Sequence, residues 1–168
     1  LREIAPGRGE DTLLKAATVL GGYAARAYAE RSIWVRARDG ESIPVSLVYK
    51  KGAPLESMPM FITGYGAYEI STDPAFSVAR VSMLDRGVLY AVPHVRGGGE
   101  MGRAWYETGR RLNKKHTFED FVDATAALQD CGLADPARTV ANGGSAGGLL
   151  MGAVANLAPE RYAGIEAD

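Results

Sequence analysis

The sequence contains few of the residue types that build disulfides, metal sites or membrane spans. Its 168 residues include one cysteine, Cys131, and two histidines, His94 and His116. A single cysteine cannot form an internal disulfide, so we expect a reducing, cytoplasmic compartment. The histidines and the cysteine show no metal-ligand spacing, so no metal is expected. No hydrophobic run approaches the roughly 18 residues that a membrane-spanning helix needs.

The sequence also lacks an excess of charge of either sign. Its 19 lysines and arginines are balanced by 20 aspartates and glutamates, for a formal net charge of −1. This balance argues against binding to nucleic acid or to an anionic membrane. Four basic residues do cluster, and we expect them to form a solvated surface. They are Arg110, Arg111, Lys114 and Lys115.

The length allows one domain with a hydrophobic core, and two full domains are not expected. Residues 1–17 mix Pro6, glycines and charges with one short apolar stretch, which predicts a linker or a lone strand. Residues 18–168 are then the globular part. The chain begins at Leu1 rather than Met, so we expect it to be part of a longer protein.

Strands alternate with helices along most of the globular part. Two β-branched and aromatic runs, residues 32–38 and 43–49, flank Asp39-Gly40 and predict an antiparallel hairpin. Further strands are predicted at residues 58–63, 88–95 and 138–142, and helices at 76–86 and 146–157. This alternation predicts an α/β fold, with a mostly parallel sheet and crossover helices behind an amino-terminal antiparallel hairpin.

Two of the helix predictions are more detailed. A third helix is predicted to begin at Thr117 as its N-cap, with Asp120 in the capping-box position, and to end at Gly132. The helix at residues 146–157 is apolar on all sides until Pro159, so we expect it to be buried.

The segment between the last predicted strand and helix carries a G-x-S-x-G motif, formed by Gly143, Ser145 and Gly147. A serine on such a tight turn adopts a strained backbone, and glycines two residues away on either side avoid clashes with the strand and helix. The turn exposes the hydroxyl and directs the backbone N–H of Ala146 toward a developing oxyanion. Ser145 is therefore the predicted nucleophile. The alternative is a glycine-rich turn that only packs tightly or holds a phosphate.

A second glycine cluster, residues 96–102, formally matches the dinucleotide motif G-x-G-x-x-G. The acidic residue expected about twenty positions later should end a strand, whereas Glu119, Asp120 and Asp123 fall within a predicted helix. A structural loop beside the active edge of the sheet is the favoured interpretation, and no cofactor is expected.

With these segments identified, the sequence resembles the prolyl oligopeptidase family of serine peptidases, and its oligopeptidase B branch in particular. The matching segments run through almost the whole chain. They include Ala37-Arg38-Asp39-Gly40, Gly64-Tyr65-Gly66-Ala67-Tyr68, Leu84-Asp85-Arg86-Gly87, His94-Val95-Arg96-Gly97-Gly98-Gly99-Glu100, Asn113-Lys114-Lys115-His116-Thr117-Phe118 and residues 143–156.

The resemblance implies an α/β-hydrolase domain that cleaves short peptides after Arg or Lys and is screened by an amino-terminal β-propeller. Residues 1–17 would be the end of that propeller and its linker. Ser145 matches the nucleophile, Tyr65 the residue that completes the oxyanion hole beside the Ala146 N–H, and Tyr68 and Asp73 match substrate-binding positions. Partners would be short peptides, the propeller and the remaining carboxy-terminal part of the hydrolase domain.

The individual residues also allow simpler interpretations. Tyr65 and Tyr68 could serve ordinary aromatic packing, and Asp73, which precedes Pro74, could cap a helix or form a turn. The chain departs from the family pattern at Ala75, where a second acid is usual, and at Thr63, where a tyrosine is usual. A preference for paired basic residues therefore does not follow from the resemblance.

A serine nucleophile needs a histidine base and an acid that orients it, in the chain order Ser, acid, His in α/β-hydrolases. Both histidines precede Ser145, and 23 residues follow it. We therefore expect a truncated hydrolase domain that lacks its triad acid and histidine and is inactive alone. The alternatives are an α/β-hydrolase esterase or lipase and a non-catalytic interaction domain.

Overall fold

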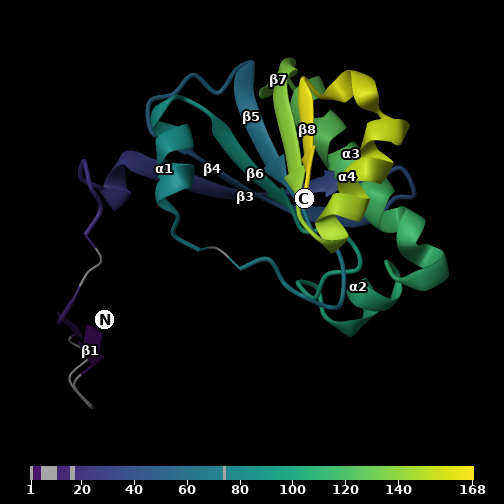
Figure 1. The fold of residues 1–168 in the computed structure, drawn as a ribbon, viewed down its shortest axis with the longest axis horizontal. Coiled ribbons are helices and arrows are strands. Elements are labelled where there is room, and N and C mark those ends of the chain that lie inside the picture. Colours follow the sequence, from purple (N-terminus) through teal and green to yellow (C-terminus); the bar gives the residue numbers. More distant parts are fainter. Residues whose placement is uncertain (1, 5–10, 16–17, 74) are drawn as a thin grey trace.

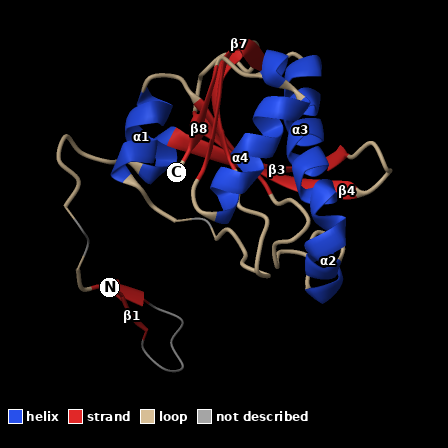
Figure 2. Cartoon of the chain, turned by 45° about the vertical axis from the view of Figure 1, so that its right-hand side comes forward, coloured by secondary structure: helices blue, strands red, loops and turns tan. Residues whose placement is uncertain are grey.

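The computed structural model describes residues 2–4, 11–15, 18–73 and 75–168. Near the amino terminus, β1 (Arg2–Ile4) and β2 (Asp11–Leu13) form an antiparallel two-stranded sheet. Figures 1 and 2 show this pair away from the main body. The remaining residues of the predicted linker at 1–17 lie outside the described residues, apart from residues 14 and 15. Its assignment to a propeller stays a prediction.

The main sheet has six strands in the order β3-β4-β6-β5-β7-β8. Its strands are β3 (Tyr28–Arg36), β4 (Ser42–Lys50), β5 (Met58–Thr63), β6 (Leu89–Pro93), β7 (Ala134–Gly143) and β8 (Gly164–Ala167). The pairs β3/β4 and β4/β6 are antiparallel, whereas β6, β5, β7 and β8 run parallel. The predicted α/β fold with an antiparallel amino-terminal hairpin is confirmed.

Helices cover both faces of this sheet, as parallel strands require. Helix α1 (Val78–Asp85) packs on β4 and β6, and α3 (Lys114–Asp130) and α4 (Ala146–Leu157) contact each other on the other face (Figures 1 and 2). The short α2 (Arg103–Glu107) precedes α3. No helix in the described part of the chain is long and apolar enough to span a membrane.

The chain passes from β5 to its neighbour β6 and then returns to place β7 on the other side of β5. In open α/β sheets, ligands bind at the carboxyl ends of the strands where the order reverses in this way. The reversal here lies between β5 and β7, which are followed by Tyr65 and Ser145 respectively. The topology therefore brings the two predicted catalytic side chains to one place on the sheet edge.

The predicted start of the third helix is wrong. Helix α3 begins at Lys114, and Thr117 lies inside it, fully buried, with its hydroxyl within hydrogen-bonding distance of the carbonyl oxygens of Arg96 (2.6 Å) and Gly109 (3.0 Å). Asp120 does not cap the helix either. It is fully buried and accepts hydrogen bonds from Arg96, because a buried carboxylate needs a charged partner.

The expectation that the helix at residues 146–157 is wholly buried is also wrong. In α4 the side chains of Leu150, Met151 and Val154 are fully buried, but Leu149 is 61% exposed and Leu157 is 46% exposed. The apolar composition therefore corresponds to core packing on one face of the helix only. The opposite face is open in this structure.

Candidate active site

The predicted nucleophile lies on the turn between β7 and α4. Ser145 has φ 57° and ψ −116°, a left-handed conformation that non-glycine residues rarely adopt. The residue is exposed, and its hydroxyl forms no hydrogen bond with any described residue. Its backbone N–H donates to the carbonyl oxygen of Asp168 (2.7 Å), and the Asp168 N–H donates to the Gly143 carbonyl (3.1 Å). These two bonds fix the strained turn to the end of β8.

The glycines of the motif are required by close backbone contacts. A Cβ atom on Gly143 would lie 2.5 Å from the carbonyl oxygen of Gly147. A Cβ atom on Gly147 would lie 2.6 Å from the carbonyl oxygen of Gly64 and 3.7 Å from the Cα of Tyr65. Strand, nucleophile helix and tyrosine loop therefore meet through their backbones, as the sequence motif predicted for the first two.

Tyr65 lies in the loop after β5, between Gly64 and Gly66, and the backbone of each of these glycines is in close contact with another glycine. Gly64 meets Gly147, while Gly66 meets Gly97, where an added Cβ would lie 2.2 Å from the Gly66 carbonyl oxygen. The parallel pairing of β5 with β7 aligns Thr63 with Asn142, shortly before Tyr65 and Ser145. Tyr65 is thus held beside the first turn of α4, where the N–H of Ala146 has no partner within the helix.

The glycine cluster at residues 96–102, which contacts the Tyr65 loop, is anchored by the side chain of Arg96. Its guanidinium is buried and donates to both carboxylate oxygens of Asp120 (2.9 and 2.5 Å) and to Asp39 (2.6 Å). Burial opposes the charge, but the hydrogen bonds that Arg96 donates to Asp120 and Asp39 outweigh it and raise the pKa of Arg96. The loop that presses Gly97 against Gly66 is therefore tied to α3 and to the β3–β4 turn.

Tyr68 lies close to Tyr65, with 6.4 Å between the ring centroids. It has φ 57° and is 70% exposed. Its ring borders a cavity of about 350 Å³ on which Ala146 and Leu149 of α4 also open. The sequence-predicted residues Ser145, Ala146, Tyr65 and Tyr68 are thus grouped at one edge of the sheet.

Asp73 lies elsewhere. It is exposed and borders a separate cavity of about 60 Å³, together with Arg80 and His94. The cavity beside α4 does not include it. Its role in substrate binding stays a prediction.

Neither histidine lies at Ser145. The Nε2 atom of His94 is 2.8 Å from the Ser46 hydroxyl, and its Nδ1 atom is 3.3 Å from a carboxylate oxygen of Glu100. His116 directs Nδ1 to the carbonyl oxygen of Thr108 (2.9 Å). The contact between His94 and Ser46 could not be predicted from the sequence, because the two residues are 48 positions apart and meet only through the pairing of β4 with β6.

The group formed by Ser46, His94 and Glu100 has the order of partners found in a catalytic triad, but not its setting. Ser46 lies in the middle of β4, paired with β3 on one side and β6 on the other. The backbone around it is therefore engaged in the sheet and cannot form an oxyanion hole. Glu100 also accepts a hydrogen bond from the Thr72 N–H (2.8 Å), which anchors the segment after Tyr68. This group holds loops together.

Burial alone would raise the pKa of Glu100, but hydrogen bonds from His94 and from the Thr72 backbone outweigh it. The pKa of Glu100 consequently lies below its ordinary value of 4.5.

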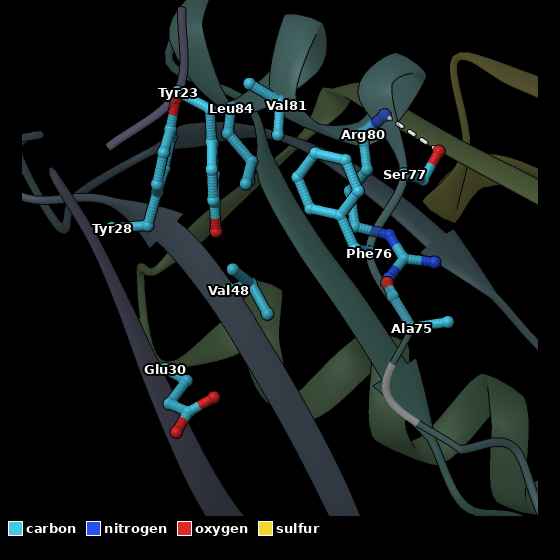
Figure 3. Close-up of a pocket in the computed structure, with 10 residues that line it drawn as sticks. All are labelled: Tyr23, Tyr28, Glu30, Val48, Ala75, Phe76, Ser77, Arg80, Val81 and Leu84. Atoms are coloured by element: carbon cyan, nitrogen blue, oxygen red, sulfur yellow. Dashed lines mark hydrogen bonds between the residues drawn. The ribbon is translucent and has the colours of Figure 1, made fainter. Parts of the chain in front are cut away.

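A further cavity of about 270 Å³ lies between the start of β3 and α1 (Figure 3). Tyr23 stacks on Tyr28 and meets Phe76 edge to face, with centroid distances of 5.8 and 4.8 Å. Arg80 is fixed in its wall by the N-cap bond to Ser77 that Figure 3 shows. None of the predicted site residues lines this cavity. Within the described ranges, no group of three His, Cys, Asp or Glu side chains is placed to hold a metal ion.

Residues 74–168 match the model of the prolyl oligopeptidase family. The chain is 52% identical over 162 residues to dipeptidyl aminopeptidase BI of Pseudoxanthomonas mexicana, which covers 95% of the chain and 22% of that protein. It is 42% identical over 156 residues to protease 2 of Moraxella lacunata, covering 92% of the chain and 22% of that protein.

Solved structures agree. Oligopeptidase B from Trypanosoma brucei, in a closed form with covalently bound antipain, matches with a TM-score of 0.88 at 42% identity. That match covers 94% of this chain and 22% of the trypanosomal one. Oligopeptidase B from Leishmania major matches with a TM-score of 0.90 at 39% identity, covering 98% and 23% respectively. The chain thus spans about 22% of the length of the first curated relatives it matches.

Proposed function

Because the chain belongs to the prolyl oligopeptidase family, we propose that it forms the nucleophile-bearing part of a serine oligopeptidase. The observation that carries the proposal is the grouping of an exposed, strained Ser145 with the free N–H of Ala146 and the loop of Tyr65. Residues 18–168 then belong to the hydrolase domain and residues 1–17 to the end of a propeller and its linker. The single cysteine favours a cytoplasmic location.

In the proposed reaction, the Ser145 oxygen attacks the carbonyl carbon of a peptide bond. The carbonyl oxygen becomes an oxyanion that accepts hydrogen bonds from the Ala146 N–H and the Tyr65 hydroxyl. When the tetrahedral intermediate collapses, the amine leaves with a proton and an acyl-enzyme remains on Ser145. Water then releases the acid by the same route.

A general base must take the proton of Ser145 in this sequence. His94 and His116 are engaged elsewhere, with Ser46 and Glu100 and with the Thr108 carbonyl respectively. We therefore propose that the histidine and its acid are contributed from outside these 168 residues, and that the 168-residue segment alone is inactive.

A fluorophosphonate probe tests this assignment. In the full-length gene product we expect rapid, stoichiometric labelling that Ser145→Ala abolishes, whereas the 168-residue segment alone should label slowly or not at all. A full-length protein that does not label would overturn the peptidase proposal. Rapid labelling of the segment would show that it holds its own base.

The specificity proposed is cleavage after Arg or Lys, supported by the similarity to protease 2 and to oligopeptidase B. The 52% identity to a dipeptidyl aminopeptidase favours a second candidate, the removal of amino-terminal dipeptides. Two reporters with a basic residue before the scissile bond separate these activities. One has a blocked amino terminus, and the other is a dipeptide reporter with a free amino terminus. Ester reporters test the esterase alternative, and covalent binding of antipain, detected as a mass increase, provides a control that does not depend on turnover.

A non-catalytic interaction domain is the remaining alternative. If the full-length Ser145→Ala variant kept the biological activity of the protein, that alternative would replace the peptidase proposal.

A further inference from the structure

The cavity beside the nucleophile helix is strongly basic. Among the described residues that border it with Ala146 and Leu149 are Arg110, Arg111 and Lys114, and none is an aspartate or glutamate. Three of the four clustered basic residues, for which the sequence predicted only a solvated surface, therefore face this cavity. The fourth, Lys115, is 72% exposed and pairs with Glu119 (3.0 Å) outside it.

The three cations differ in how far they are neutralised. Arg110 has a counter-ion, since its Nε donates to Glu107 (2.5 Å). Lys114 is half-buried and donates to the carbonyl oxygen of Gly66 (2.5 Å), with no carboxylate partner in the described ranges. The side chain of Arg111 is exposed and forms no hydrogen bond or ion pair with any residue that the structure describes. Burial of a charge without a counter-ion is unfavourable, and burial here lowers the pKa of Lys114.

The backbone that carries these cations is fixed relative to Ser145. A Cβ on Gly109 would lie 2.1 Å from the backbone nitrogen of Gly97, so residues 96–97 and 109 are in direct contact. Gly97 meets Gly66 in turn, and Gly66 follows Tyr65. Arg111 itself has φ 51° and begins a short 3-10 helix, Arg111–Asn113, just before α3. The backbone that carries these charges is thus held in place beside the loop of Tyr65.

We propose that this cavity is a subsite for a carboxylate of the peptide substrate, with Arg111 as its main ligand and Lys114 as the second. The inference rests on the proposed peptidase function and adds a substrate class to it. A guanidinium binds a carboxylate through two parallel hydrogen bonds. A neutral amide has only one acceptor oxygen and no negative charge, so it binds more weakly. The carboxylate can be the carboxyl terminus of a short peptide or the side chain of an Asp or Glu near the scissile bond.

Binding to an inactive enzyme tests the subsite without requiring turnover. The full-length Ser145→Ala variant is titrated with one short peptide that contains a basic residue, in versions that carry a carboxylate or an amide at the carboxyl terminus. A second pair replaces Glu by Gln beside the basic residue, so the two sources of carboxylate are distinguished. At low salt we expect at least one carboxylate version to bind about tenfold more tightly than its amide.

Variants of the cluster decide which residue is responsible. Adding Arg111→Gln should reduce the preference to within about twofold. Arg111→Lys should retain only part of it, because an ammonium keeps the charge but not the two parallel hydrogen bonds, and Lys115→Gln should leave it unchanged. Equal binding of carboxylate and amide versions in both pairs would overturn the inference, as would equal effects of Arg111→Gln and Lys115→Gln.

The parallel measurement of hydrolysis and fluorophosphonate labelling with Ser145 present keeps the two proposals apart. Cleavage without a carboxylate preference in binding refutes the subsite alone. A preference that Arg111→Gln removes, in a protein that neither labels nor cleaves, supports the subsite and refutes the peptidase function.

Discussion

Gly147, two residues past the nucleophile position, lies directly against Gly64, the residue before Tyr65. A Cβ atom on Gly147 would be 2.6 Å from the Gly64 carbonyl oxygen, closer than real Cβ atoms approach backbone. The contact links the helix that carries Ser145 and the Ala146 N–H to the loop that carries the Tyr65 hydroxyl. Its closeness sets how far apart the two proposed oxyanion donors lie.

Gly147→Ala should therefore abolish most of the activity. The added methyl group must push the Tyr65 loop away from α4, and misplacement by about 1 Å can cost about 100-fold in rate. We expect kcat/KM of the full-length protein to fall by at least about that factor. The matched control is Gly152→Ala in the same helix, where no described atom beyond the neighbouring helix backbone lies within 4 Å of the added Cβ. That variant should keep full activity and gain about 0.5–1 kcal/mol in helix stability.

Tyr65→Phe removes the proposed side-chain donor of the oxyanion hole and leaves the ring in place. Loss of one such donor typically lowers kcat by about 100- to 1,000-fold. We expect a fall of that size with little change in KM, because the hydrogen bond forms in the transition state. Tyr68→Phe is the control, since its exposed ring borders the cavity and it is assigned no role in the oxyanion hole. Equal losses of kcat in the two variants would contradict the assignment.

Asp120→Asn tests the buried ion pair with Arg96. Both side chains are almost completely shielded from water, at 6% and 0% exposure, and the substitution leaves the Arg96 guanidinium paired with the partly exposed Asp39 instead of a buried carboxylate. Breaking such a pair typically costs about 3–5 kcal/mol. We expect a large drop in the thermal unfolding temperature of the full-length protein. Asp85→Asn, which removes a solvent-exposed pair with Lys50, should leave that temperature almost unchanged.

Glu100 should make the stability of the fold sensitive to acid. Its pKa in the folded protein lies below the ordinary 4.5, so the ionised carboxylate stabilises the fold at pH values above 4.5. That contribution disappears as the pH falls through the lower folded value, when the hydrogen bonds from Thr72 and His94 weaken. Stability measured from pH 7 to pH 3 should fall less steeply in Glu100→Gln than in the parent protein. An identical pH profile would exclude this role.

The local features of the site were predictable from sequence, because each depends on neighbours along the chain. The strand, turn and helix around Ser145 follow from glycine spacing and hydrophobic periodicity, and the structure places α4 at Ala146 as expected. The hairpin around Asp39-Gly40 is likewise confirmed.

Features that depend on distant partners were missed or misjudged. Thr117 and Asp120 satisfy the sequence rule for a capping box, but their hydrogen bonds go to Arg96 and Gly109, which tertiary packing brings to them. A buried charge pair outweighs a capping preference of about 1 kcal/mol. The basic cavity was missed for the same reason, since Arg111 and Leu149 come together only in the folded chain.

The pairing of Thr63 with Asn142 sets the relative positions of Tyr65 and Ser145. Because β5 and β7 are adjacent parallel strands, the hydrogen bonds between them fix which residue of β5 lies beside which residue of β7. Tyr65 and Ser145 follow these strands, so their relative position depends on that register. A single insertion within either strand would shift one of the two proposed catalytic residues by about 3.3 Å and reverse the faces of the side chains beyond it. Insertions between β4 and β5 leave this ladder intact. We therefore expect insertions in the loop between β4 and β5 to preserve activity, and insertions between Met60 and Tyr65 to abolish it.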